Sequence, residues 1–242
     1  SARIAEARSR ARNYEPVHTA DSITYGIAKA RLIVANKDTD QAAIAYFERE
    51  PYEYQSDAER YGRAAAYLRA DQNIDAQLIF EELVINDPEV ISYHIGLADA
   101  QLANEAIAEM ADTFEHASEL FPRNIPLTIH YAEALLQIGQ ARKAHKMLLD
   151  LFNHFQPTPE QVRLISRAAT QAGDVAEAHY YMAEYRIMIG DLVGGINFLR
   201  QALRMPDLEE IQRIRFEARI DFVRDYMTEE QLQRLQRSRV IG

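Results

Sequence analysis

The stretch that decides the fold runs from Pro88 to Pro122 and reads PEVISYHIGLADAQLANEAIAEMADTFEHASELFP. These two prolines lie about 34 residues apart, a spacing typical of repeats built from helix pairs, and Pro157 follows after a nearly equal interval. Good helix formers fill the stretch, glycine is rare, and β-branched residues form no long run, which favours helices over strands. We therefore expect two amphipathic helices between successive prolines.

The same spacing recurs at other positions on both sides of this stretch. A repeat of about 34 residues made of two helices is the signature of the tetratricopeptide (TPR) fold. We expect small residues where the two helices of a pair approach each other and bulky residues where one pair meets the next. The positions that share the spacing are Ala64, Ala98, Ala132 and Ser166; Ala76, Met110, Ala144 and Ala178; Phe80 and Phe114; and Gly139 and Gly173.

The sequence thus predicts an all-α fold, a right-handed superhelical solenoid of TPR helix pairs with a C-terminal capping helix. We expect a junction helix at 1–14, the solenoid at 21–206 and the capping helices at 207–242. Within the solenoid, 21–50 is expected to be a degenerate first pair. Asp87-Pro88-Glu89 and Thr158-Pro159-Glu160-Gln161 are each predicted to start a helix, because each has a capping residue followed by proline and an acid.

The charge of the chain limits its partners. The formal net charge is −10, so most of the surface repels a polyanion, and we expect no nucleic-acid partner. Between Asp71 and Phe121 there is no Lys or Arg but there are twelve carboxylates. Two explanations remain open, a solvated set of helix faces or an acidic patch for a basic partner or neighbouring domain. No stretch of 18 apolar residues occurs, so we expect no membrane-spanning segment.

Catalytic motifs are missing from the sequence. The seven histidines are scattered, and none stands in the His-Glu-x-x-His pattern of a zinc hydrolase. The chain has no Cys, so it has neither a thiol nucleophile nor a thiolate metal site. We therefore expect this chain to contain no catalytic or metal-binding residues and to act as a protein-binding scaffold.

A TPR solenoid usually binds extended peptides or partner helices in its concave groove, which is lined by one stripe of each first helix. Registering the repeat onto the chain predicts which residues line this groove. They mix charged and apolar side chains, and whether they bind a partner or merely solvate the inner face stays open. The predicted groove residues are Tyr61, Leu68, Arg69, Asp99, Leu102, Glu133, Leu136, Arg163, Arg167, Tyr180 and Glu184.

Three segments resemble a known family. They are the opening Ser1-Ala2-Arg3-Ile4-Ala5-Glu6-Ala7-Arg8, the segment Ile27-Ala28-Lys29-Ala30-Arg31, and Arg215-Phe216-Glu217-Ala218-Arg219-Ile220-Asp221 near the end. Together with the order of repeats, they resemble the C-terminal region of the β-barrel assembly-enhancing proteases, bacterial zinc metalloproteases in which a His-Glu-x-x-His peptidase domain precedes a TPR region. In this resemblance, residues 1–14 match the closing helix of the peptidase domain.

The resemblance implies a periplasmic location and a role in quality control of outer-membrane proteins. The implied partners are unfolded outer-membrane proteins or the barrel-assembly machinery, together with the chain's own peptidase domain. Zinc is expected in that peptidase domain and not in this chain, because no catalytic residue of the family falls on it. The alternative is a free-standing TPR adaptor for protein–protein interaction with no protease attached.

Overall fold

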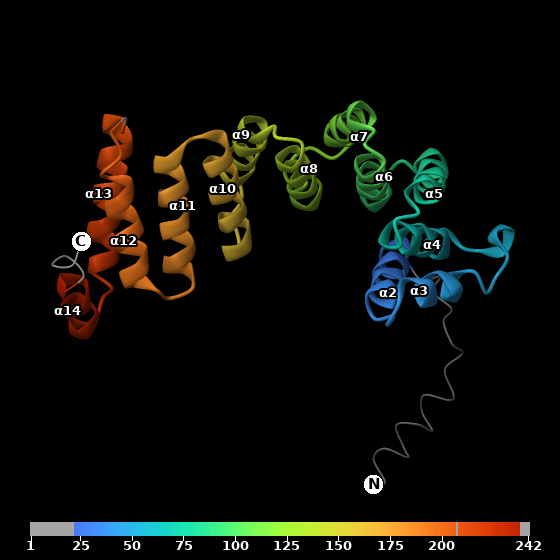
Figure 1. The fold of residues 1–242 in the computed structure, drawn as a ribbon, viewed down its shortest axis with the longest axis horizontal. Helices are drawn as coiled ribbons and strands as arrows, with labels where there is room; N and C mark the ends of the chain where they lie inside the picture. The colour runs from blue at the N-terminus through green and yellow to red at the C-terminus, as the bar shows by residue number, and fades with distance from the viewer. Residues whose placement is uncertain (1–21, 207, 238–242) are drawn as a thin grey trace, which may run out of the picture. The chain divides into compact units, whose positions relative to one another are not determined.

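The computed structural model describes residues 22–206 and 208–237, and in these ranges the chain forms thirteen α-helices, one short 3₁₀ helix and no strand (Figure 1). The predicted all-α fold is confirmed, and so is its construction from TPR-type helix pairs. No helix in these ranges is both long and apolar enough to cross a bilayer. The predicted junction helix at 1–14 lies outside the described residues.

The chain divides into two compact units, with the boundary between Thr113 and Phe114, inside α7 (Ile107–Leu120). Unit 1 holds the first helices, and the remaining helices belong to unit 2. Unit 1 contains α2 (Ile23–Ala35), α3 (Asp40–Phe47), η1 (Tyr52–Tyr54), α4 (Asp57–Arg69), α5 (Asn73–Asn86) and α6 (Ile91–Ala103). Unit 2 contains α8 (Ile125–Gln137), α9 (Ala141–Phe152), α10 (Pro159–Ala172), α11 (Val175–Met188), α12 (Leu192–Ala202), α13 (Glu210–Arg224) and α14 (Glu229–Arg237).

The turns inside successive helix pairs share one backbone geometry. A left-handed residue ends the first helix at Asp71 (φ 58°), Glu105 (φ 60°), Gly139 (φ 78°) and Gly173 (φ 86°), and each lies one repeat length from the next. The amide that follows each of them donates to the carbonyl five residues earlier at 2.8–2.9 Å, which closes the helix end. The backbone conformation therefore repeats with the same period as the side chains, although glycine occupies only two of the four left-handed positions.

Bulky residues of one pair fit onto glycines of the next pair. A Cβ atom added to Gly62 would come within 2.2 Å of the Phe47 ring, and one added to Gly96 would come within 2.4 Å of the Phe80 ring. Gly62 and Gly96 occupy equivalent places in successive repeats, so α3 and α5 each place an aromatic ring against the same position of the following first helix. The predicted alanine and phenylalanine positions of the repeat are buried, including Ala64, Ala98, Ala132, Phe80 and Phe114, whereas Gly139 and Gly173 lie exposed in the turns.

One predicted helix start is confirmed and the other is wrong. At Thr158, the side-chain hydroxyl accepts from Gln161 N at 3.4 Å and Gln161 Oε1 accepts from Thr158 N at 2.9 Å, the reciprocal capping box. At Asp87, a side-chain oxygen accepts from Glu89 N at 3.3 Å, and the main-chain carbonyl accepts from Val90 N at 3.3 Å. These bonds fold Pro88 into a turn, so α6 begins only at Ile91.

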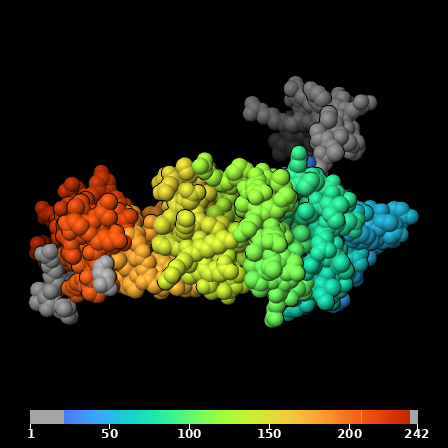
Figure 2. All heavy atoms as spheres, turned by 90° about the horizontal axis from the view of Figure 1, so that it is seen from above, coloured from blue at the N-terminus to red at the C-terminus, as the bar shows by residue number. Residues whose placement is uncertain are grey.

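From α8 to α13, successive helices of unit 2 pack side by side in chain order, as the colour progression from yellow-green to red follows (Figure 2), and α14 packs on α12. Helix α11 packs on both α10 and α12, so it serves as the second helix of one pair and the first helix of the next. Helix α13 packs on α12 and buries Phe216, Ile220 and Val223 in a shared core. The 206/207 domain boundary stays a prediction.

Candidate protein-binding groove

A surface pocket of about 470 Å³ lies between α8 and α10, the first helices of two successive pairs in unit 2. Helix α8 contributes Ile129 and Glu133, which are four residues apart and therefore on one face. Helix α10 contributes Arg163 and Arg167 with the same spacing, and Leu164 forms part of the apolar floor. Glu160 and Gln161 complete the lining.

The pocket holds two cations and two anions in exposed surface pairs. Arg167 lies 3.9 Å from Glu133, and their side chains keep 54% and 45% of their exposure. Arg163 lies 2.7 Å from Glu160, also at the surface. Exposed pairs of this kind contribute at most about 1 kcal/mol, so a partner's charges can replace them at little cost. The arrangement suits an extended polypeptide with apolar and charged side chains.

Three of the predicted groove residues, Glu133, Arg163 and Arg167, are brought together in this pocket. The sequence argument missed Glu160, because it was assigned only to the start of α10. The available signal was its spacing of three and seven residues from Arg163 and Arg167, which puts all three on one helix face.

Other predicted groove residues of unit 2 are covered by the chain itself. Leu136 is buried. The ring of Tyr180 stacks on Phe216 of α13 with centroids 5.0 Å apart, and Glu184 accepts two hydrogen bonds of 2.7 Å from Arg219. Burial raises the pKa of Tyr180. Tyr180 and Glu184 therefore hold α13 in place, and their assignment to a groove is corrected.

The predicted groove residues of α4 also have internal partners. Tyr61 is 4% exposed, its hydroxyl accepts from Arg31 Nε at 2.6 Å, and burial raises its pKa. Arg69 pairs with Asp40 at 2.7 Å and donates to main-chain carbonyls at the end of α2 and in the turn that follows it. Leu68 packs against the core of unit 1. Tyr61 therefore belongs to the core and Arg69 fixes the α2–α3 turn, so their assignment to a groove is corrected. The prediction failed because helical periodicity does not reveal which face a neighbouring helix covers.

On α6, Asp99 and Leu102 are half-buried. The carboxylate of Asp99 acts on Tyr61, whose pKa it helps to raise after the larger effect of burial. Both residues keep part of their surface, so their assignment to a binding face stays a prediction.

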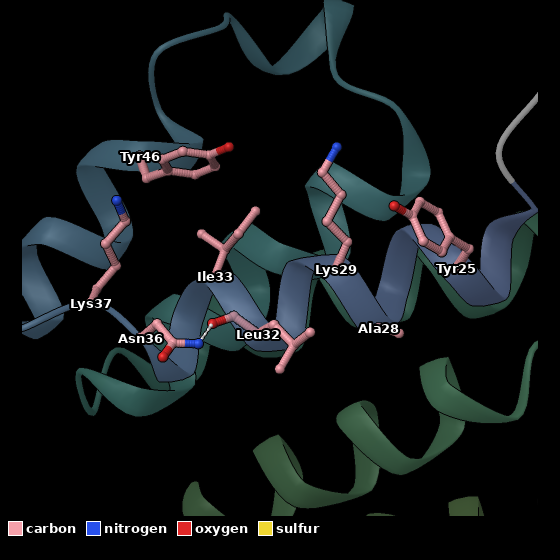
Figure 3. A pocket seen from close by; sticks show the side chains of 8 residues that line it. All are labelled: Tyr25, Ala28, Lys29, Leu32, Ile33, Asn36, Lys37 and Tyr46. Carbon is pink, nitrogen blue, oxygen red and sulfur yellow. Dashed lines mark hydrogen bonds between the residues drawn. The ribbon is translucent and has the colours of Figure 1, made fainter. Parts of the chain in front are cut away.

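A second pocket, of about 430 Å³, lies on α2 and α3 in unit 1 and was not predicted (Figure 3). Tyr25 and Leu32 on α2 are exposed, and Tyr46 of α3 lies opposite Ile33. The charged residues in its lining are both lysines, Lys29 and Lys37. This pocket is therefore apolar with a cationic rim.

The part of the chain that the structure describes offers no group of three His, Cys, Asp or Glu side chains that could hold a metal ion. These described residues therefore do not supply the ligand set of a catalytic zinc site. The α8–α10 pocket also lacks a side chain positioned as a nucleophile beside a base.

No protein-family model matches the chain. The chain is 29% identical over 225 residues to a putative β-barrel assembly-enhancing protease of Vibrio cholerae, which covers 90% of this chain and 46% of that protein. It is 25% identical over 225 residues to the β-barrel assembly-enhancing protease of Escherichia coli K12, with 92% and 46% covered. The predicted resemblance to these proteases is confirmed, and the chain spans about half the length of these relatives.

Solved structures with a similar fold are TPR proteins. Yeast Tom70 superposes with a TM-score of 0.51 at 14% identity, over 84% of this chain and 47% of that one. A tetratricopeptide repeat protein from Parabacteroides merdae superposes with a TM-score of 0.50 at 11% identity, over 90% of this chain and 89% of that one. At these identities the likeness establishes the fold alone.

Proposed function

We propose that this chain is the protein-binding TPR region of a periplasmic zinc metallopeptidase and that it engages outer-membrane-protein clients or their assembly machinery. The observation that carries the proposal is the match along 225 residues to proteins named β-barrel assembly-enhancing protease. The TPR fold supports a role in protein interaction, because stacked helix pairs present extended surfaces to partners. Zinc and the hydrolytic residues would belong to a peptidase domain of the same protein.

The α8–α10 pocket is the proposed contact site for the client. Ile129 and Leu164 supply an apolar floor that an unfolded chain can cover with its own apolar side chains. The pairs Glu133–Arg167 and Glu160–Arg163 supply charges of both signs at the rim. Such a surface accepts many sequences with modest affinity, which suits a quality-control protein that meets varied clients.

The test is photocrosslinking of a urea-unfolded outer-membrane β-barrel protein, diluted into buffer, to a photoreactive amino acid at Ile129. The double change Glu133→Lys with Arg167→Glu preserves an ion pair but inverts both charges that the client meets. We expect loss of most of the crosslinked product with an unchanged melting temperature. The matched control exchanges the exposed pair on α14, Glu230→Arg with Arg234→Glu, which should leave crosslinking intact.

Crosslinking that is unchanged by the Glu133/Arg167 exchange would reject the pocket as the client site. A second measurement determines the intact mass and zinc content of the native gene product. It distinguishes the protease from a free-standing adaptor. A species much heavier than this 242-residue chain with about one zinc per molecule supports the proposal. A zinc-free species of about this size would reject the protease and favour the adaptor.

A further inference from the structure

Helix α5 carries a stripe of large aliphatic side chains that the described part of unit 1 leaves uncovered. Ile74, Leu78 and Ile85 are 71%, 60% and 80% exposed. They lie four and eleven residues apart, so they fall within about 40° of one another around the helix. The opposite face of α5 buries Ala76 and Leu83 in the core. Helix α5 therefore has two apolar faces, and only one of them is used inside the unit.

The charges beside this stripe all have one sign. Asp75 and Glu82 lie on one side of it and Glu81 on the other, and no Lys or Arg occurs between Asp71 and Phe121. Glu82 is compensated within the unit, because it accepts hydrogen bonds from Tyr52 at 2.7 Å and from Arg60 at 3.0 Å. Glu81 accepts a hydrogen bond from the neutral side chain of Gln77. The rim of the stripe thus keeps uncompensated negative charge.

We propose that the outer face of α5, defined by Ile74, Leu78 and Ile85, is a docking surface for a basic amphipathic helix. Such a helix would cover the aliphatic stripe with its apolar side and place Lys or Arg beside Asp75 and Glu81. An acidic helix would meet repulsion, and a helix with uncharged flanks would remove carboxylates from water without compensation. The proposal goes beyond the α8–α10 pocket, since it concerns a different unit and a different kind of partner.

The chain itself contains a sequence of this chemistry, which provides a probe. In residues 1–14, Ile4, Ala7 and Ala11 recur at helical spacing, and arginines at 3, 8, 10 and 12 fall on both sides of that apolar line. A fluorescein-labelled peptide of residues 1–14 is therefore a suitable ligand. A matched peptide with the four arginines changed to glutamate keeps the apolar residues and reverses the charge.

The experiment measures binding of these two peptides by fluorescence anisotropy to the full 242-residue chain. Binding is also measured to a second protein, which is the full chain with four arginines changed to Gln: Arg3, Arg8, Arg10 and Arg12. This protein cannot compete with the peptide through its own arginines. We expect the arginine peptide to bind at least one of the two proteins, more weakly at high salt, and the glutamate peptide to bind neither.

The variant Leu78→Gln with Ile85→Gln tests the stripe in whichever protein binds. Both positions are exposed and Gln is a good helix former, so the melting temperature should stay the same. We expect binding to weaken about tenfold or more, since two aliphatic contacts are lost. The control is Leu32→Gln, an equally exposed leucine of unit 1 beside the cationic Lys29 and Lys37, which should leave binding unchanged.

Binding only to the protein without its own arginines supports the proposal, because it means that the chain's own basic segment fills the site. Binding to neither protein overturns it. Equal loss in Leu32→Gln and in Leu78→Gln with Ile85→Gln also overturns it, since the contact would then be unspecific. None of these outcomes depends on Glu133 or Arg167, so failure here leaves the proposed client site untouched.

Discussion

At the scale of single residues, the repeat turns show how one backbone position is filled by different residue types. The left-handed position is glycine at 139 and 173 but carries a side chain at Asp71 and Glu105. A side chain costs about 1–2 kcal/mol in this conformation, whereas glycine adopts it freely. Aspartate reduces the cost by local hydrogen bonding, and glutamate, with its longer side chain, does so less well.

The variant Glu105→Gly should therefore raise the free energy of unfolding by about 0.5–1 kcal/mol, because relief of the strained φ exceeds the added freedom of the unfolded chain. Urea denaturation of the purified chain measures the change. The control is Glu105→Ala, which removes the carboxylate but keeps the Cβ atom and should gain little. A gain of equal size in both variants would show that charge, and not backbone strain, limits the turn.

At the scale of elements, a partly buried ion pair joins α13 to α11. Glu177 of α11 is buried and accepts hydrogen bonds from Gln212, at 2.8 Å, and from Arg215. The Arg215 guanidinium also covers the Tyr180 ring at 4.3 Å. By contrast, Arg213 of the same helix makes only a 3.8 Å pair with the exposed Glu210.

Arg215→Ala should lower the free energy of unfolding by about 2 kcal/mol, because Glu177 would keep its burial and lose a charged donor. Arg213→Ala on the same helix should change it by less than about 0.5 kcal/mol. Urea denaturation measures both. Equal effects would mean that Glu177 finds another donor or water, and that the pair is not what holds α13.

The outer face of α13 carries apolar side chains, although terminal helices of solenoids typically have a polar outer face. Three exposed side chains lie along it, Ile211, Ile214 and Phe222, while Phe216 on the inner face is fully buried. Tyr226, which follows the helix, is also exposed. A single helix can bury one apolar face in the core and still leave a second apolar stripe in solvent, because different residues of the helix form the two faces. Covering the previous pair therefore does not require the cap to be polar outside.

At the scale of the whole molecule, global stability should depend on pH through buried histidine. Burial lowers the pKa of His145 below its ordinary value of 6.5, although Asp174 and Glu177 act in the opposite direction. Its Nε2 atom is buried without a hydrogen-bond partner among the described residues. Below pH 6.5 the unfolded chain therefore binds a proton more readily than the folded chain, and stability falls as the pH falls.

Thermal or urea unfolding at about pH 7.5 and about pH 5.5 tests this dependence. The loss of stability between the two pH values should be smaller in His145→Gln than in the wild type, because one proton-linked group is removed. The variant keeps His179, whose pKa burial also lowers, so part of the dependence should remain. An identical loss in both proteins would show that His145 does not carry the linkage.

The sequence by itself determined the helix-pair repeat of this protein, the capping box at Thr158 and the resemblance to the assembly-enhancing proteases. These features are local or periodic: the spacing of the repeat fixes which positions must be small, and a cap depends on residues within one turn. The same reasoning was wrong at Asp87, where a competing turn around Pro88 delays α6 until Ile91.

Only the tertiary structure decided which exposed-looking residues are available to a partner. Tyr61, Tyr180 and Glu133 occupy similar places in the helical pattern, yet the first two are covered by other parts of the chain and the third lies in an open pocket. The reason is physical: helical periodicity assigns a residue to a face, but the burial of that face depends on which neighbouring helix packs against it.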